Sequence, residues 1–102
     1  MNSEILSKAI EHYGIENQLL VAMEEANEFS QAISKYLRSK CKDDDVEVRQ
    51  HIIEEMADVL IMAEQVKMIL AIQDYEIELY KDYKLNRLNN RIKELMNEQE
   101  VY

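Results

Sequence analysis

Two short segments of the sequence carry carboxylates in the same order, an arrangement suited to binding a hard cation. Residues 24–28 read EEANE and residues 54–58 read EEMAD. In each segment a further acid follows the second acid by three residues, and positions three apart share one face of a helix. The sequence therefore predicts two carboxylate pairs, Glu25 with Glu28 and Glu55 with Asp58.

The two pairs occupy equivalent positions relative to the apolar residues of their helices. The helical angle is set to zero at Ala22 in the first helix and at Ile52 in the second, and each residue adds about 100°. Glu25 and Glu55 then fall at about 300°, and Glu28 and Asp58 at about 240°. The apolar stripe of each helix is centred at about 10–20°, so both pairs flank the core-facing stripe on the same side. If the two helices pack antiparallel through these stripes, the four carboxylates can converge.

Converging carboxylates at a half-buried edge are strongly unfavourable unless a cation joins them. Oxygen-only ligands favour Mg²⁺, with Mn²⁺ as a substitute, and Mg²⁺ also accepts phosphate oxygens as ligands. His12 and His51 do not show metal-ligand spacing with the acidic segments, and Cys41 lies in a polar stretch. The alternative interpretation is that the acids simply form solvated helix faces.

The charge of the chain excludes some partners and points to others. A net charge of −9 makes nucleic acids and anionic membranes poor partners. Residues 83–93 nevertheless contain four basic residues and no acid. Lys84, Arg87 and Arg91 share a helical row with Tyr80 and could bind substrate phosphates. They could equally pair with surface acids of neighbouring helices.

The sequence predicts an all-α fold in one domain, residues 1–102, because it has no proline, one glycine and no strand pattern. We expect the first two helices over residues 3–12 and 15–39. The third should begin at a capping box of Asp44 and Glu47 and end at about residue 72, and the fourth should begin near Asp74. The apolar stripes expected on the two central helices are Ile15, Leu19, Ala22, Ala26, Phe29, Ile33 and Leu37, and Val48, Ile52, Met56, Val59, Ala63, Val66 and Leu70.

Residues 59–63, which read VLIMA, are apolar on every side of a helix. A helix that is apolar all round is buried all round, and four short helices can hardly cover it. We therefore expect a homo-oligomer with this segment near the interface; the alternative is a well-covered central helix in a monomer. A single cysteine and the lack of a signal peptide or long apolar span favour a cytoplasmic protein.

The acidic segments also resemble the motifs of a known family. Residues 24–28 match the E-E-x-x-E motif and residues 55–58 the E-x-x-D motif of the MazG-like family, and the similarity spans roughly residues 14–92. Members of that family are all-α nucleoside triphosphate pyrophosphohydrolases that use Mg²⁺ and assemble as dimers or tetramers. The resemblance implies a four-helix bundle of this type, with helices two and three long and antiparallel.

The resemblance also implies roles for individual residues. Glu25, Glu28, Glu55 and Asp58 would be the metal ligands. Glu24 would lie beside them and would either polarise the attacking water or order the groups that surround the ligands. The proton of the attacking water would pass to Glu24 or to a ligand such as Glu25 in a second role. A lysine and an arginine of the last helix would meet the triphosphate.

The expected activity is Mg²⁺-dependent cleavage of a (d)NTP to a (d)NMP and pyrophosphate. Within the same superfamily, phosphoribosyl-ATP and dUTP or dCTP pyrophosphohydrolases are the nearest alternatives, because they share the carboxylate pattern. A different class is a catalytically silent helical module for oligomerisation or regulation. The sequence leaves the preferred base and sugar open.

Overall fold

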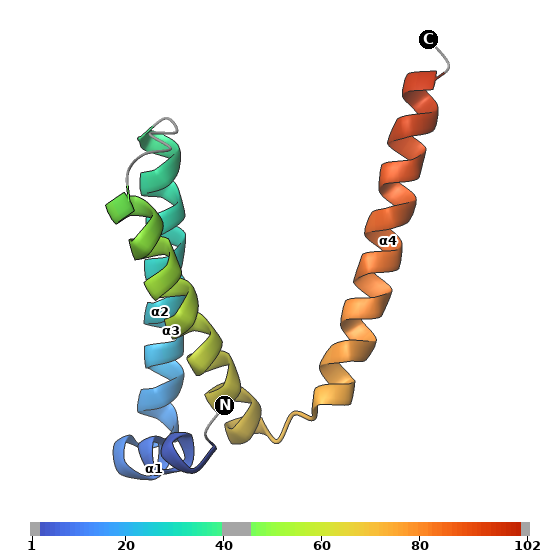
Figure 1. Cartoon of the computed structure of the whole chain (residues 1–102). Coiled ribbons are helices and arrows are strands. Elements are labelled where there is room, and N and C mark those ends of the chain that lie inside the picture. Colours follow the sequence, from blue (N-terminus) through green and yellow to red (C-terminus); the bar gives the residue numbers. More distant parts are fainter. Residues whose placement is uncertain (1–2, 40–45, 101–102) are drawn as a thin grey trace. The chain divides into compact units, whose positions relative to one another are not determined.

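The computed structural model describes residues 3–39 and 46–100, and four α-helices make up nearly all of these ranges (Figure 1). The helices are α1 (Ser3–Tyr13), α2 (Ile15–Arg38), α3 (Val46–Leu70) and α4 (Asp74–Glu100). The all-α class is confirmed, and the expected helix ends agree closely with the observed ones. Asp44, expected to begin the capping box of the third helix, lies outside the described residues. None of the described helices is long and apolar enough to cross a membrane.

The chain divides into two units, residues 1–71 with α1 to α3 and residues 72–102 with α4. The end of α3 is marked by Ala71, which takes a positive φ of 54° that side chains with a Cβ rarely adopt. Gln73 precedes α4, and its backbone N–H donates to Oε2 of Glu76 at 2.8 Å, as in one half of a capping box. This boundary therefore forms without a glycine or proline.

Gly14 separates α1 from α2. Its φ of 93° lies in a region that glycine reaches without strain. Its N–H donates to the Ile10 carbonyl at 2.9 Å, and its own carbonyl accepts from the Gln18 N–H at 3.0 Å. The turn lets α1 pack against one end of the pair formed by α2 and α3 (Figure 1).

The interface between α2 and α3 is the main packing surface of residues 1–71, and the two helices run antiparallel along it (Figure 1). It is unusually polar, because Gln18, Glu55 and Gln65 are buried. The Gln18 side-chain amide donates to the Gln65 side-chain carbonyl at 2.7 Å. The buried apolar side chains of the described residues are Leu6, Ala32, Val48 and Met62.

The faces through which α2 and α3 meet differ from the predicted stripes. Gln18, Ala32 and Glu55 are buried although none of them belongs to a stripe. At about 100° per residue, the buried residues of the two helices are rotated by roughly 75–95° from the stripe centre toward the carboxylates. The exposed members of the predicted stripes are Ile15, Ala26, Ile33 and Leu37 on α2 and Met56, Ala63 and Leu70 on α3. The predicted contact faces were wrong because the apolar arc of each helix is wider than the surface that one partner helix can cover.

The apolar run at residues 59–63 is only partly covered within residues 1–71. Met62 is buried, whereas Leu60 is 57% exposed and Ile61 is 40% exposed. The remaining exposed large apolar side chains of α2 and α3 are Ile15, Leu20, Met23, Ile33, Leu37, Val46, Ile53, Met56, Met68 and Leu70. We refer to Leu60, Ile61 and this set as the exposed apolar surface of α2 and α3. So much exposed apolar area is typical of a binding surface.

Candidate metal centre

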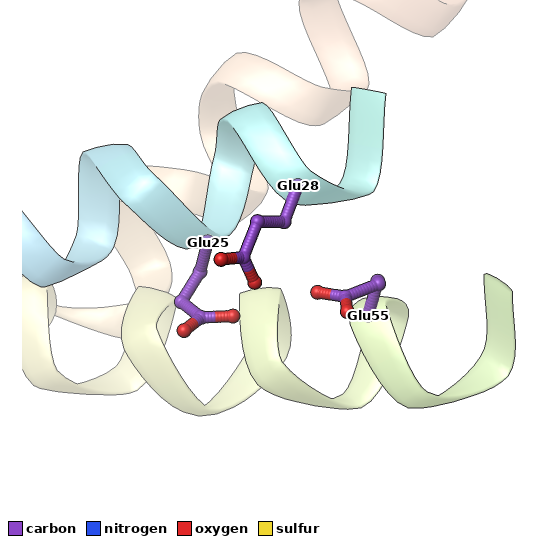
Figure 2. Close-up of side chains that lie close together, drawn as sticks. All are labelled: Glu25, Glu28 and Glu55. Carbon is purple, nitrogen blue, oxygen red and sulfur yellow. The ribbon is translucent and has the colours of Figure 1, made fainter. Parts of the chain in front are cut away.

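Three carboxylates from α2 and α3 meet at the interface of these helices. Glu25 and Glu28 extend from α2 and Glu55 from α3 toward a common space (Figure 2). One carboxylate oxygen from each lies within 4.8 Å of the other two. The prediction that the two acidic segments converge is therefore correct for these three residues.

The cluster lies deeper in the interface than the sequence suggested. Glu55 is only 9% exposed and Glu25 is half-buried, whereas Glu28 is exposed. One oxygen of Glu25 and one of Glu55 are inaccessible to solvent and have no hydrogen-bond partner. A buried carboxylate oxygen without a partner is costly, because nothing replaces the water that it loses. The cluster therefore has unsatisfied capacity for a positively charged ligand.

Burial and mutual repulsion both favour protonation in this cluster. The pKa of Glu25 is raised from 4.5, first by burial and then by the negative charges of Asp58, Glu28 and Glu55 and by a hydrogen bond with Asp58. The pKa of Glu55 is also raised by burial and by the charges of Glu28 and Asp58, while His51 acts in the opposite direction. Both shifts disfavour the ionised form, which a bound cation would stabilise.

Asp58 and Glu24 differ in how the structure places them. Asp58 is half-buried on α3 and close enough to raise the pKa of both Glu25 and Glu55, but it does not belong to the group of oxygens within 4.8 Å. Glu24 is exposed on α2 and also lies outside that group. Glu54, the neighbour of Glu55 on α3, is exposed. Three of the four predicted ligands thus converge closely, with the fourth beside them.

Sequence reasoning missed the contact between His51 and the cluster. The Nδ1 atom of His51 lies 3.8 Å from Oε1 of Glu55, one helical turn further along α3. The signal was present in the sequence, because residues four apart on a helix are neighbours. His51 can therefore orient Glu55 or compensate part of its charge.

The predicted phosphate-binding residues lie on α4, in the second unit. Lys84, Arg87 and Arg91 are exposed, and their spacing places them in one row of that helix. Lys84 and Tyr80 also line a mostly apolar groove on the N-terminal half of α4, together with Ile72, Glu76, Ile77 and Lys81. The groove gives this part of the row an apolar wall beside a positive charge.

The donor set of the cluster fits a hard divalent cation. All the donors are carboxylate oxygens, which Mg²⁺ and Mn²⁺ prefer. The unpartnered oxygens of Glu25 and Glu55 are available to such an ion. The exposure of Glu28 leaves one side of the cluster open to water and to a substrate.

Comparison with known proteins found no match of any kind. No family model matches the sequence, and no curated protein or solved structure is significantly similar to the chain. The similarity of residues 24–28 and 55–58 to MazG-like motifs therefore stays a prediction from those motifs.

Proposed function

We propose that this chain is a Mg²⁺-dependent nucleotide pyrophosphohydrolase that cleaves a (d)NTP to a (d)NMP and pyrophosphate. The observation that carries the proposal is the meeting of Glu25, Glu28 and Glu55 within 4.8 Å, with buried oxygens that lack partners. Among hydrolytic reactions, transfer of a phosphoryl or nucleotidyl group to water makes the most direct use of such a carboxylate-bound cation. The resemblance to MazG-like motifs supports the same class.

The residues of the first unit would hold the cation and the attacking water. Glu25, Glu28 and Glu55 would bind the ion, and Asp58 would complete or adjust the set from its adjacent position. A bound Mg²⁺ would lower the pKa of a coordinated water and neutralise phosphate charge. The proton released by the water needs an acceptor, and Glu24 can fill this role if substrate binding draws it toward the cluster; otherwise Glu25 takes it.

The residues of the second unit would bind the phosphates. Lys84, Arg87 and Arg91 present three positive charges on one side of α4 in an otherwise acidic chain. Arginine can bind two phosphate oxygens at once, and such charge-assisted hydrogen bonds are stronger than neutral ones.

We further propose that the enzyme is a cytoplasmic homodimer or homotetramer. The exposed apolar surface of α2 and α3 supports this, because a second copy could cover it. The same surface would also suit a catalytically silent helical module for oligomerisation or regulation. A measured activity distinguishes the two, since only the enzyme needs the carboxylates in their ionised, metal-binding form.

The decisive experiment is a panel of unmodified and modified (d)NTPs, dUTP, dCTP and phosphoribosyl-ATP, assayed with Mg²⁺ for pyrophosphate and orthophosphate release. We expect pyrophosphate and a nucleoside monophosphate, with loss of activity in Glu55→Gln. Glu54→Gln is the matched control, because Glu54 is the exposed neighbour on the same helix. Orthophosphate as the first product, or full activity in Glu55→Gln, would refute the proposed reaction. No release from any substrate would favour the silent module.

A further inference from the structure

One buried polar contact of the α2–α3 interface, near the N-terminal end of α2, has no role in the proposed chemistry. Gln18 is 6% exposed and Gln65 is 4% exposed, and their side-chain amides share a hydrogen bond of 2.7 Å. The two residues are 47 positions apart in the chain. An interface of this kind can be filled by apolar side chains, so two buried amides within it require an explanation.

The position of this pair relative to the carboxylates is specific. Seven residues along α2 from Gln18 lies Glu25, and seven residues back along α3 from Gln65 lies Asp58. Ten residues along α2 from Gln18 lies Glu28, and ten residues back along α3 from Gln65 lies Glu55. Because the helices are antiparallel, one register that pairs Gln18 with Gln65 also sets Glu25 against Asp58 and Glu28 against Glu55.

The carboxylates cannot select this register by themselves. Their negative charges repel, and each would be better solvated if the helices slid apart along their axes. Apolar contacts are non-directional, so a slipped register can also bury apolar side chains. A slip of about one turn would place Gln18 opposite Met62 or Ile69, and Gln65 opposite Ile15 or Ala22. Either slip leaves two amides buried against apolar side chains, which is unfavourable.

We propose that the Gln18–Gln65 hydrogen bond fixes the register of α2 against α3 that brings Glu25, Glu28 and Glu55 together. The two glutamines are thus positioning residues for the carboxylate cluster. A single buried polar pair that selects one alignment of two helices is a known device in coiled coils. The inference concerns the helix register, and its consequence for metal binding rests on the proposed function.

The test replaces both glutamines by methionine, which has nearly the same length and shape but no amide. Gln18→Met/Gln65→Met leaves no unpaired polar group, so the helices should stay folded with equal or higher thermal stability. The matched control is Gln31→Met/Gln50→Met, which changes two exposed glutamines on the same two helices. Circular dichroism and thermal melting establish that each variant is folded.

The helix register is measured by pulsed electron resonance between spin labels at Glu16 and Arg49, in a background that carries Cys41→Ser. Both label positions are exposed, and in the observed register they are separated along the helix axes by roughly 27 Å, from about 1.5 Å per residue. A one-turn slip would change this separation by about 5 Å. Dilution with unlabelled protein restricts the signal to labels within one chain.

The second measurement is binding of Mn²⁺ without nucleotide. We expect the methionine pair to give a shifted or broadened distance distribution and at least a tenfold weaker Mn²⁺ affinity, while the control matches the wild type in both. An unchanged distance distribution in the folded methionine pair would overturn the inference, and so would a shifted one with unchanged Mn²⁺ affinity. If the methionine pair does not fold, Gln18→Asn/Gln65→Asn removes the same bond with shorter amides and is judged by the same outcomes.

Failure of the proposed function gives a different result. If the wild-type protein binds no Mn²⁺ at all, the metal site is wrong. In that case the distance measurement alone decides whether the glutamine pair sets the register.

Discussion

The exposed apolar surface of α2 and α3 leads to a quantitative prediction about assembly. We expect the chain to form a dimer or tetramer, and Leu60→Glu to dissociate it. Leu60 is 57% exposed, so a glutamate there can reach water in the separate subunit. In an oligomer that covers this surface, the same carboxylate would be buried without a partner.

The size of this effect follows from the cost of burying a charge. The effective penalty is several kcal/mol per ion, and a two-fold symmetric interface contains the substitution twice. Even a total loss of about 3 kcal/mol would weaken association by more than about 100-fold, since about 1.4 kcal/mol corresponds to a factor of ten. Ile61→Glu should act in the same direction, although Ile61 is less exposed in the subunit.

The assay is light scattering or analytical ultracentrifugation over a range of micromolar concentrations. The wild type should have at least twice the subunit mass of 12.1 kDa. Leu60→Glu should have the subunit mass while it keeps its helical circular dichroism. Gln31→Glu, an exposed polar position on α2, is the matched control and should assemble normally. A wild-type mass near 12.1 kDa, or unchanged assembly of Leu60→Glu, would refute the reasoning.

Three further predictions concern the two proposed binding regions. EDTA should abolish pyrophosphate release and Mg²⁺ or Mn²⁺ should restore it; turnover in excess chelator would rule out the carboxylate site. Because the folded state raises the pKa of Glu55 above 4.5, its ionisation destabilises the metal-free protein as pH rises. Calorimetry in EDTA should therefore find Glu55→Gln more stable than wild type at neutral pH, with the difference vanishing well below pH 4.5; a constant difference would contradict this. Lys84→Ala and Arg87→Ala should each weaken nucleotide binding by about 1.5–3 kcal/mol but leave Mn²⁺ binding intact; normal nucleotide binding would mean that the row is only a surface feature.

The sequence predicted the existence of the carboxylate cluster because helical periodicity is a local property. The spacing of Glu25 and Glu28, and the matching position of Glu55 on its own helix, required only residues per turn. Gly14 marked the first helix boundary for a similar reason, since its backbone conformation favours glycine. The boundary after α3 carried no such residue, and Ala71 adopts its positive φ in a sequence context without an obvious signal.

The depth of the cluster could not be predicted in the same way. Periodicity shows which residues are apolar, but it does not show which part of a wide apolar arc meets which partner. The sequence assigned Glu25 and Glu55 to the edge of the helix contact, whereas the structure places them within it. The burial of Gln18 and Gln65 could not be predicted either, because a glutamine in an amphipathic helix usually faces solvent. Their pairing depends on a contact between distant parts of the chain.

The rotation of the contact face accounts for both unusual features of the first unit. When α2 and α3 meet through their carboxylate flanks, Glu25 and Glu55 lose solvent, and the opposite margin of each apolar arc becomes exposed. An arrangement through the stripe centres would have covered more apolar surface and left the acids better hydrated. The observed arrangement is therefore unfavourable for an isolated, metal-free subunit on both counts. A cation in the cluster would offset the first cost, and a second copy on the exposed apolar surface would offset the second. The same packing choice thus explains why metal binding and assembly are expected together.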